Sequence, residues 1–152
     1  MNLSQNFTLD KALYSKTANK LGIINAPSPA ELETMHKTAV GMERVRALLG
    51  NLPIRVTSWF RCHALNLAVG SKESSQHRKG EAVDFTCDKY GSPMEICTVI
   101  AANADLIRYD QLILENGWVH ISFAIVSRAA PRKQVITITP DGKPHPGLLY
   151  YV

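Results

Sequence analysis

The chain has 152 residues, a length typical of a single domain with one functional site. Hydrophobic residues make up 45% of it and charged residues 20%, a balance typical of folded globular proteins that excludes an intrinsically disordered chain. No apolar run approaches the roughly 20 residues that a membrane helix needs, so we expect no stable insertion into a membrane.

The 17 basic and 13 acidic residues give a net charge of +4, and the basic residues are scattered along the chain. On charge alone, nucleic acid, an anionic cell wall and plain solubility all remain open. The three cysteines form no C-x-x-C pair, which argues against a disulfide scaffold. Residues 1–16 contain neither a long apolar stretch nor a small-residue cleavage site, so we expect no signal peptide.

Helix signals dominate the first third of the chain. Residues 7–21 are typical of one or two short helices that end near Gly22. A longer helix is predicted to begin at Ser28, because Ser28 and Glu31 form a capping box around Pro29. Apolar side chains then recur at helical spacing until Gly50, which predicts that this helix packs against the core.

Short strands and helices alternate after Pro53. The expected elements are a strand over 54–58, a helix over 63–69, a polar loop over 70–76, a strand over 81–87, a helix over 93–103 with Ser92 as its cap, strands over 110–115 and 118–125, and a strand over 134–139. This order predicts an α+β fold, with helices packed around a largely antiparallel sheet. No repeat or linker divides the sequence, so we expect one domain over residues 1–152.

A predicted hairpin gives the first functional inference. Asn116-Gly117 is a strong two-residue turn signal, and this turn places two apolar rows on one face of the hairpin. The opposite face then carries three cross-strand pairs, Glu115 with Trp118, Ile113 with His120, and Gln111 with Ser122. Asp110 falls on the wrong face to be a partner of His120. Considered alone, this polar face could simply be exposed to solvent.

A second segment suggests a metal site. His77 precedes the segment Ala82-Val83-Asp84-Phe85, where an ionised carboxylate in an apolar setting needs a partner or a metal. Together with His120, these residues offer two imidazoles and one carboxylate. Three protein ligands with a fourth position left for water form the arrangement of a catalytic zinc site. Other divalent metals also accept such ligands.

These residues carry a family resemblance. Ser75, His77, Gly80, Ala82 and Asp84 form S-x-H-x-x-G-x-A-x-D, which resembles the signature of zinc D-Ala-D-Ala carboxypeptidases and endopeptidases. The segment 118–122, Trp-Val-His-Ile-Ser, is similar to that family's second block, and the segment 61–70 to a stretch common in phage-associated members. The wider grouping includes lysostaphin-like peptidases and the hedgehog signalling domain. The resemblance covers about residues 7–125, which leaves a strand and tail over 126–152.

The resemblance implies a role for each matching residue. His77, Asp84 and His120 would bind one Zn²⁺ ion. Glu115 would act as general base and acid, although it stands five positions before His120 where many members have three. Arg61 would stabilise the anion formed from the substrate carbonyl. Ser75, Trp118 and Ser122 would support the ligands or line the substrate cleft. Trp118 and Trp59 are each typical of a cleft wall and, equally, of a packed side chain.

The function implied is that of a zinc peptidase that cuts the stem peptides of bacterial peptidoglycan. A short single-domain chain for which no signal peptide is expected resembles a bacteriophage endolysin with endopeptidase activity. Such a protein would stay in the host cytoplasm until lysis and then act on the cell wall. We expect a monomer that binds peptidoglycan peptides and no nucleic acid. The alternatives are a D-Ala-D-Ala carboxypeptidase, a non-catalytic zinc-binding module and a phage structural protein of the same fold.

Overall fold

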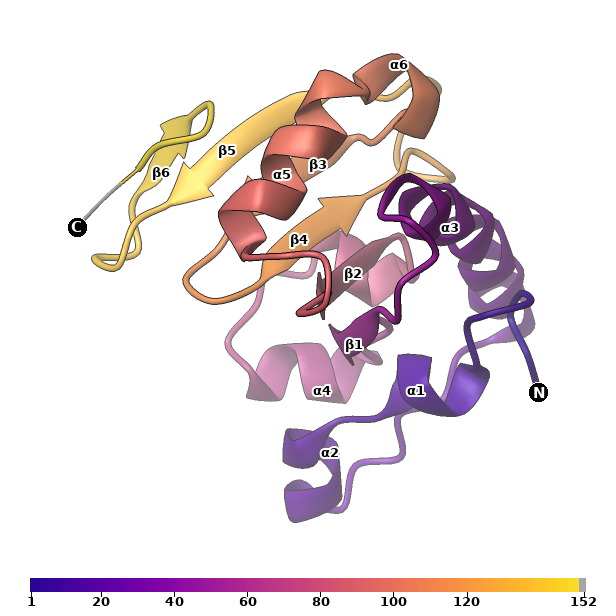
Figure 1. The fold of residues 1–152 in the computed structure, drawn as a ribbon. Helices are drawn as coiled ribbons and strands as arrows, with labels where there is room; N and C mark the ends of the chain where they lie inside the picture. The colour runs from indigo at the N-terminus through magenta and orange to yellow at the C-terminus, as the bar shows by residue number, and fades with distance from the viewer. Residues whose placement is uncertain (151–152) are drawn as a thin grey trace.

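The computed structural model of the protein describes residues 1–150. The helices are α1 (Leu9–Leu13), α2 (Lys16–Leu21), α3 (Pro29–Leu48), α4 (His63–Ala68), the 3₁₀ helix η1 (Gln76–Lys79), α5 (Pro93–Ala102) and α6 (Ala104–Ile107). The strands are β1 (Arg55–Ser58), β2 (Ala82–Thr86), β3 (Gln111–Leu114), β4 (Val119–Ser122), β5 (Gln134–Ile138) and β6 (Pro144–Pro146). Figure 1 shows their arrangement.

The strands form one sheet in the order β1-β2-β4-β3-β5-β6. All neighbouring strands are antiparallel except β3 and β5, which run parallel. The α+β class with a largely antiparallel sheet is therefore confirmed. The sequence did not predict α6 or β6. The first is a single turn, too short to show helical periodicity, and the second contains two prolines, which strands tolerate mainly at a sheet edge.

Local capping signals determine where the helices begin. In α3 the Ser28 side chain accepts the Glu31 amide, and the Glu31 side chain accepts the Ser28 amide, so the predicted capping box is present. The same reciprocal pair, between Ser92 and Glu95, begins α5. Gly22 ends α2 in the left-handed conformation, with φ of 67°. These ends match the sequence predictions within one or two residues.

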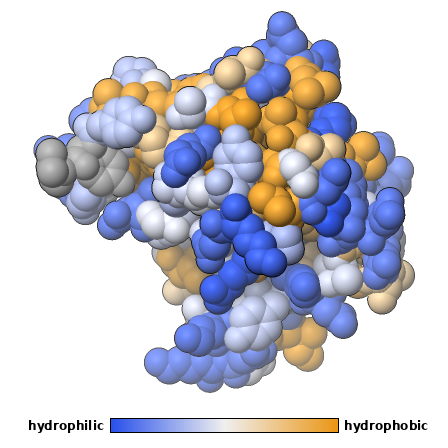
Figure 2. Space-filling model, viewed as in Figure 1, coloured by the Kyte–Doolittle hydropathy of each residue, from blue (hydrophilic) through white to orange (hydrophobic). Residues whose placement is uncertain are grey.

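The central strands of the sheet have one apolar face, which packs into the core. Its side chains are completely or almost completely buried: Val83, Phe85, Leu112, Leu114, Val119 and Ile121. Helix α5 crosses β3 and β4, and α3 lies beside the β2 and β4 end of the sheet (Figure 1). In the same view, Figure 2 shows apolar surface gathered around α5 and α6. The lower part of the molecule in this view, around α2, has a mostly hydrophilic surface.

The hairpin register is the one that the sequence predicts. Ile113 lies opposite His120, and the Glu115 amide donates to the Trp118 carbonyl oxygen at 3.1 Å. Strand β4 is shorter than the predicted 118–125, because the backbone amides of 125–127 bond to the Glu81 carboxylate and not to a neighbouring strand. The register places Glu115 and His120 on the face of the sheet opposite the core.

Candidate metal centre

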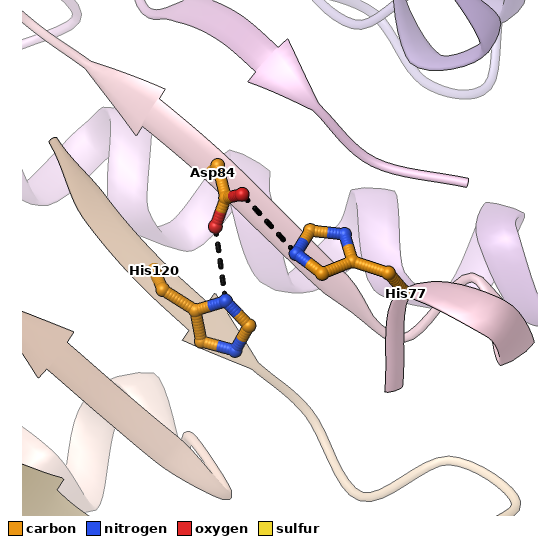
Figure 3. Close-up of side chains that lie close together, drawn as sticks. All are labelled: His77, Asp84 and His120. Carbon is orange, nitrogen blue, oxygen red and sulfur yellow. Dashed lines mark hydrogen bonds and ion pairs between the residues drawn. The ribbon is translucent and has the colours of Figure 1, made fainter. Parts of the chain in front are cut away.

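Three metal-ligating side chains from three separate elements converge on this second face (Figure 3). His77 comes from η1, Asp84 from β2 and His120 from β4. Asp84 and His120 are partners in the β2–β4 register, so their side chains project from the same face. Gly80 follows η1 with φ of 77°, a conformation that favours glycine, and this tight turn lets η1 lead directly into β2.

The Asp84 carboxylate lies between the two imidazole rings. Its Oδ1 accepts a hydrogen bond from His120 Nδ1 at 2.9 Å, and its Oδ2 lies 3.2 Å from His77 Nε2. Burial by itself raises the pKa of the Asp84 carboxyl, but the adjacent His77 and His120 outweigh burial and hold that pKa well below its ordinary value. The carboxylate is therefore ionised at neutral pH and carries a negative charge into a buried site.

His77 presents an unprotonated nitrogen to that carboxylate. Its Nδ1 lies 2.7 Å from the Trp59 carbonyl oxygen, which can only accept, so Nδ1 carries the proton. Burial lowers the pKa of His77, which keeps the ring neutral and leaves a lone pair on Nε2. This Nε2 is buried and makes no hydrogen bond, although Asp84 Oδ2 is only 3.2 Å away. Two electron-rich atoms face each other, an arrangement that a cation between them would stabilise.

The donor set suits zinc. One ligand atom from each of His77, Asp84 and His120 lies within 4.8 Å of the other two. Ligands about 2.0–2.2 Å from a tetrahedral zinc are roughly 3.3–3.6 Å apart, slightly more than the distances from Asp84 to the two rings. The bond from His77 Nδ1 to a backbone carbonyl is the kind of outer contact that fixes the tautomer of a zinc-binding histidine.

Arg61 lies against the same carboxylate. Its Nη2 is 3.9 Å from Asp84 Oδ2, and the side chain is mostly buried. The Arg61 backbone amide also donates to the His77 carbonyl oxygen at 3.0 Å, which ties the segment after β1 to η1. Burial lowers the pKa of the Arg61 guanidinium and the Asp84 charge raises it, but the group stays positive at any physiological pH. The site therefore has a fixed positive charge beside the three converging side chains.

Glu115 borders the site but does not join the three converging residues. It is half-buried at the end of β3, on the same face as His120. Burial raises the pKa of its carboxyl, the Asp84 charge raises it further, and His120 lowers it. The register of β3 and β4, with Ile113 opposite His120 and Glu115 two positions further on, places Glu115 at the margin of the centre. A small groove of about 220 Å³ also borders Glu115, but it is lined by Leu114 and by the start of α5, and it includes none of the three converging residues.

The other predicted site residues have different positions. Ser75 caps η1, and its Oγ accepts the His77 amide at 3.3 Å. Ser122 is completely buried, and its Oγ accepts the Gln111 amide at 3.1 Å, so its hydroxyl supports β3 and does not face open space. Trp118 is half-buried in the hairpin turn. Trp59 belongs to the core, where it packs edge-on against Phe7, so packing is the correct one of its two interpretations.

The remaining histidines are not part of the centre. His63 is exposed and pairs with Glu73 at 2.8 Å. His36 bonds to the Leu3 carbonyl oxygen from within α3, and His145 lies in β6. Asp110 is completely buried and bonded to Arg132, so the prediction that it does not pair with His120 is confirmed.

The site subdivides into recognisable parts: a buried carboxylate between two imidazoles, an arginine beside it and a carboxyl group at the margin. On an α+β domain, His77, Asp84 and His120 are a candidate donor set for one divalent metal ion. A model of the family described as Peptidase M15 matches residues 5–122, and the chain belongs to that family. At family level, these proteins are zinc-dependent peptidases that act on peptidoglycan. No curated protein matches the chain.

Two buried carboxylates, Glu81 and Asp110, were not expected from the sequence to have a functional role. Glu81 precedes an apolar strand, and strand alternation would have placed it on the same face as Val83 and Phe85, where a carboxylate needs partners. Asp110 was considered only as a candidate partner of His120. Both bond to the segment between β4 and β5, described below. Within residues 1–150, no helix combines the length and the apolar character that crossing a membrane requires.

Proposed function

We propose that the protein is a zinc-dependent peptidase that hydrolyses peptide bonds in the stem peptides of peptidoglycan, with His77, Asp84 and His120 as its zinc ligands. The observation that carries this proposal is the buried, unbonded Nε2 of His77 facing the ionised carboxylate of Asp84. Zinc, when bound, supplies an activated water and polarises the substrate carbonyl.

Glu115 moves the proton in this proposal. Its carboxylate takes a proton from the attacking water as the water oxygen bonds to the peptide carbonyl carbon. The carbon–nitrogen bond then breaks, and Glu115 gives the proton to the leaving amine. A carboxyl group whose pKa is raised by burial is suited to both steps, because it accepts a proton more readily than an exposed glutamate.

Arg61 stabilises the negative charge that develops on the carbonyl oxygen. Its guanidinium is mostly buried and lies 3.9 Å from Asp84, so it is already oriented before substrate binds. A preorganised charge of this kind stabilises a transition state more than a mobile surface charge does, because little reorganisation is needed during the reaction. Ser75 supports the site by fixing the start of η1 and with it the His77 ring.

We further propose that the protein is a bacteriophage endolysin with endopeptidase activity, acting as a monomer on the wall after release from the host cytoplasm. The support is the resemblance of residues 61–70 to phage-associated members and the net charge of +4, which suits an anionic wall. Removal of a terminal D-alanine is the competing reaction. Product analysis separates the two, because an endopeptidase fragments cross-linked peptidoglycan and a carboxypeptidase releases only free alanine.

The test uses purified peptidoglycan with the zinc-loaded protein, the chelated protein, Glu115→Gln and Glu33→Gln. Glu33 is 75% exposed on α3, so Glu33→Gln is a control for the loss of one carboxylate. We expect hydrolysis by the zinc-loaded protein and by Glu33→Gln, and none by the other two samples, while Glu115→Gln keeps its zinc. A zinc-loaded protein that releases no product of either kind would overturn the proposal and favour a non-catalytic zinc module.

A further inference from the structure

The segment between β4 and β5, residues 123–133, is anchored by two buried carboxylates. The first is Glu81, which is 0% exposed. Its Oε2 accepts the backbone amides of Ile125 at 2.9 Å, Val126 at 2.6 Å and Ser127 at 3.0 Å, and its Oε1 accepts the Ser127 hydroxyl. One side chain thus holds three consecutive amides, a strong constraint on a segment without regular secondary structure.

The second anchor is Asp110, which is also completely buried. Its carboxylate accepts Arg132 Nε at 3.0 Å and Nη2 at 2.8 Å, in a bidentate pair, and also the Arg132 amide. The Asp110 backbone holds both ends of the segment: its amide donates to the Ser122 carbonyl oxygen at 2.7 Å, and its carbonyl accepts the Gln134 amide at 2.9 Å. The segment is therefore fixed at its beginning, its middle and its end.

The anchored segment forms one wall of a cleft of about 470 Å³ beside the candidate metal centre. His120 lines this cleft, together with Ser75 and Gln76 from the η1 side. The cleft also contains three basic side chains, Lys79, Arg128 and Arg132. Among the described residues that line it, none is acidic. A ligand in this cleft would lie next to His120 and in a positive field.

The positive charge exceeds what the buried carboxylate requires. Asp110 is fully paired by Arg132, yet Arg128 also approaches it, with Nε 3.5 Å from Oδ2, and remains 44% exposed. Three positive charges against one negative charge leave a net charge of about +2 at the cleft. A purely structural role for Asp110 would need only one guanidinium. The surplus charges, held on an anchored segment, are suited to a carboxylate ligand, since arginine binds carboxylates through paired hydrogen bonds.

We propose that this cleft binds a free carboxylate of the substrate, so that the protein selects peptides that carry an ionised carboxylate close to the bond that is cut. Arg128 is the main contact, and Glu81 and Asp110 are positioning residues that hold its segment. This inference rests on the proposed function, because it places a peptide substrate at the adjacent centre. Fixing the arginines in advance lowers the entropy cost of binding.

Binding is measured without turnover, in zinc-loaded Glu115→Gln. The probe is a fluorescent stem peptide with free carboxylates, compared with the same peptide with those carboxylates amidated. We expect the free form to bind about tenfold more tightly, as a charge-assisted contact predicts. When Arg128→Gln is combined with Glu115→Gln, most of this difference in affinity is expected to disappear. Arg128→Lys in its place is expected to restore part of the difference. Adding Arg55→Gln, which removes the same charge from an exposed position of β1, is expected to leave the difference unchanged.

Equal affinity for the two peptides, or equal discrimination with and without Arg128→Gln, would overturn the inference. If the wild-type protein then still cuts peptidoglycan, the proposed peptidase function stands without the carboxylate site. If neither peptide binds and peptidoglycan is not cut, the proposed function fails. The carboxylate site is then tested separately, with glutarate as a small dicarboxylate probe. A shift of the Arg128 Nε–H resonance on adding glutarate, absent with glutaramide, would support the inference, and no shift would overturn it.

Discussion

Asp84 and His120 face each other across β2 and β4, and the 2.9 Å hydrogen bond between them holds the centre together from within the sheet. The two residues are thus placed by backbone pairing, the most rigid part of this fold. His77 reaches the same point from η1 through a turn that depends on Gly80. Two of the candidate ligands thus lie on paired strands of the sheet, and the third lies on a short helix that leads into β2.

Replacing Asp84 with asparagine is expected to abolish tight zinc binding. The variant keeps the size of the side chain but removes the negative charge between the two rings. Loss of residues that only orient ligands costs about 10–100-fold in affinity, so loss of a ligand should cost more than about 100-fold. Competition with a coloured chelator measures the affinity. Asp105→Asn is the matched control, because Asp105 is 97% exposed, and zinc binding as tight in Asp84→Asn as in this control would contradict the ligand assignment.

Replacing Glu81 with glutamine is expected to destabilise the protein by about 2–4 kcal/mol, because the amide NH₂ cannot accept the backbone hydrogen bonds that the carboxylate accepts. Urea unfolding measures the loss. Hydrogen exchange should also become faster at the amides of 125–127 than elsewhere. Glu33→Gln, on the exposed face of α3, should change neither quantity. Unchanged exchange at 125–127 in Glu81→Gln would show that the segment is held by other contacts.

Glu115 should titrate above its ordinary pKa of 4.5 in the metal-free protein, because burial and the Asp84 charge both disfavour its ionised form. A raised pKa in the folded state contributes stability at low pH that is lost as pH rises through that pKa. Metal-free Glu115→Gln should therefore gain stability relative to wild type as pH rises above about 4.5. Carboxyl carbon NMR and unfolding at several pH values check both statements. A midpoint at or below 4.5 would contradict them.

Replacing Gly41 with alanine is expected to destabilise the protein, although alanine usually favours a helix. A Cβ at this position would lie 2.6 Å from Cε1 of the Phe123 ring, which is buried at the end of β4. Overpacking costs about 1–3 kcal/mol, more than the 0.5–1 kcal/mol or so gained from helix propensity. Urea unfolding should show a net loss of about 1–2 kcal/mol. Val40→Ala, at an exposed position of the same helix, should change stability by less than about 0.5 kcal/mol.

The parts of the fold that local signals specify were predictable from the sequence. The capping boxes at Ser28 and Ser92 and the turn at Asn116-Gly117 fix helix starts and a strand register within a few residues. Because side chains alternate along a strand, that register was enough to place His120 and Glu115 on one face and Asp110 on the other. The spacing of His77 and Asp84 then pointed to a metal site, which the structure supports by bringing the three side chains together.

Features that depend on distant contacts were not predictable. The parallel pairing of β3 with β5 follows from where the chain returns after residues 123–133, and no local pattern encodes it. Asp110 pairs with Arg132 across 22 positions of sequence, and Glu81 reaches amides 44 to 46 positions away. Trp59 is typical of both a cleft wall and a core side chain, and only its packing against Phe7 distinguishes the two.

The two backbone hydrogen bonds of Asp110 allow the segment 123–133 to vary without a change in the sheet. Since they join Ser122 and Gln134 to the same residue, the two ends of the intervening segment are held side by side by backbone bonds alone. Loop length has only a weak effect on closure entropy, so the sheet should tolerate insertions between the Glu81-bound amides of 125–127 and Arg132, provided that these partners of the two buried carboxylates are kept. The cleft wall of 123–133 can therefore be redesigned to test the proposed peptide selectivity, while the candidate ligands on β2 and β4 remain undisturbed.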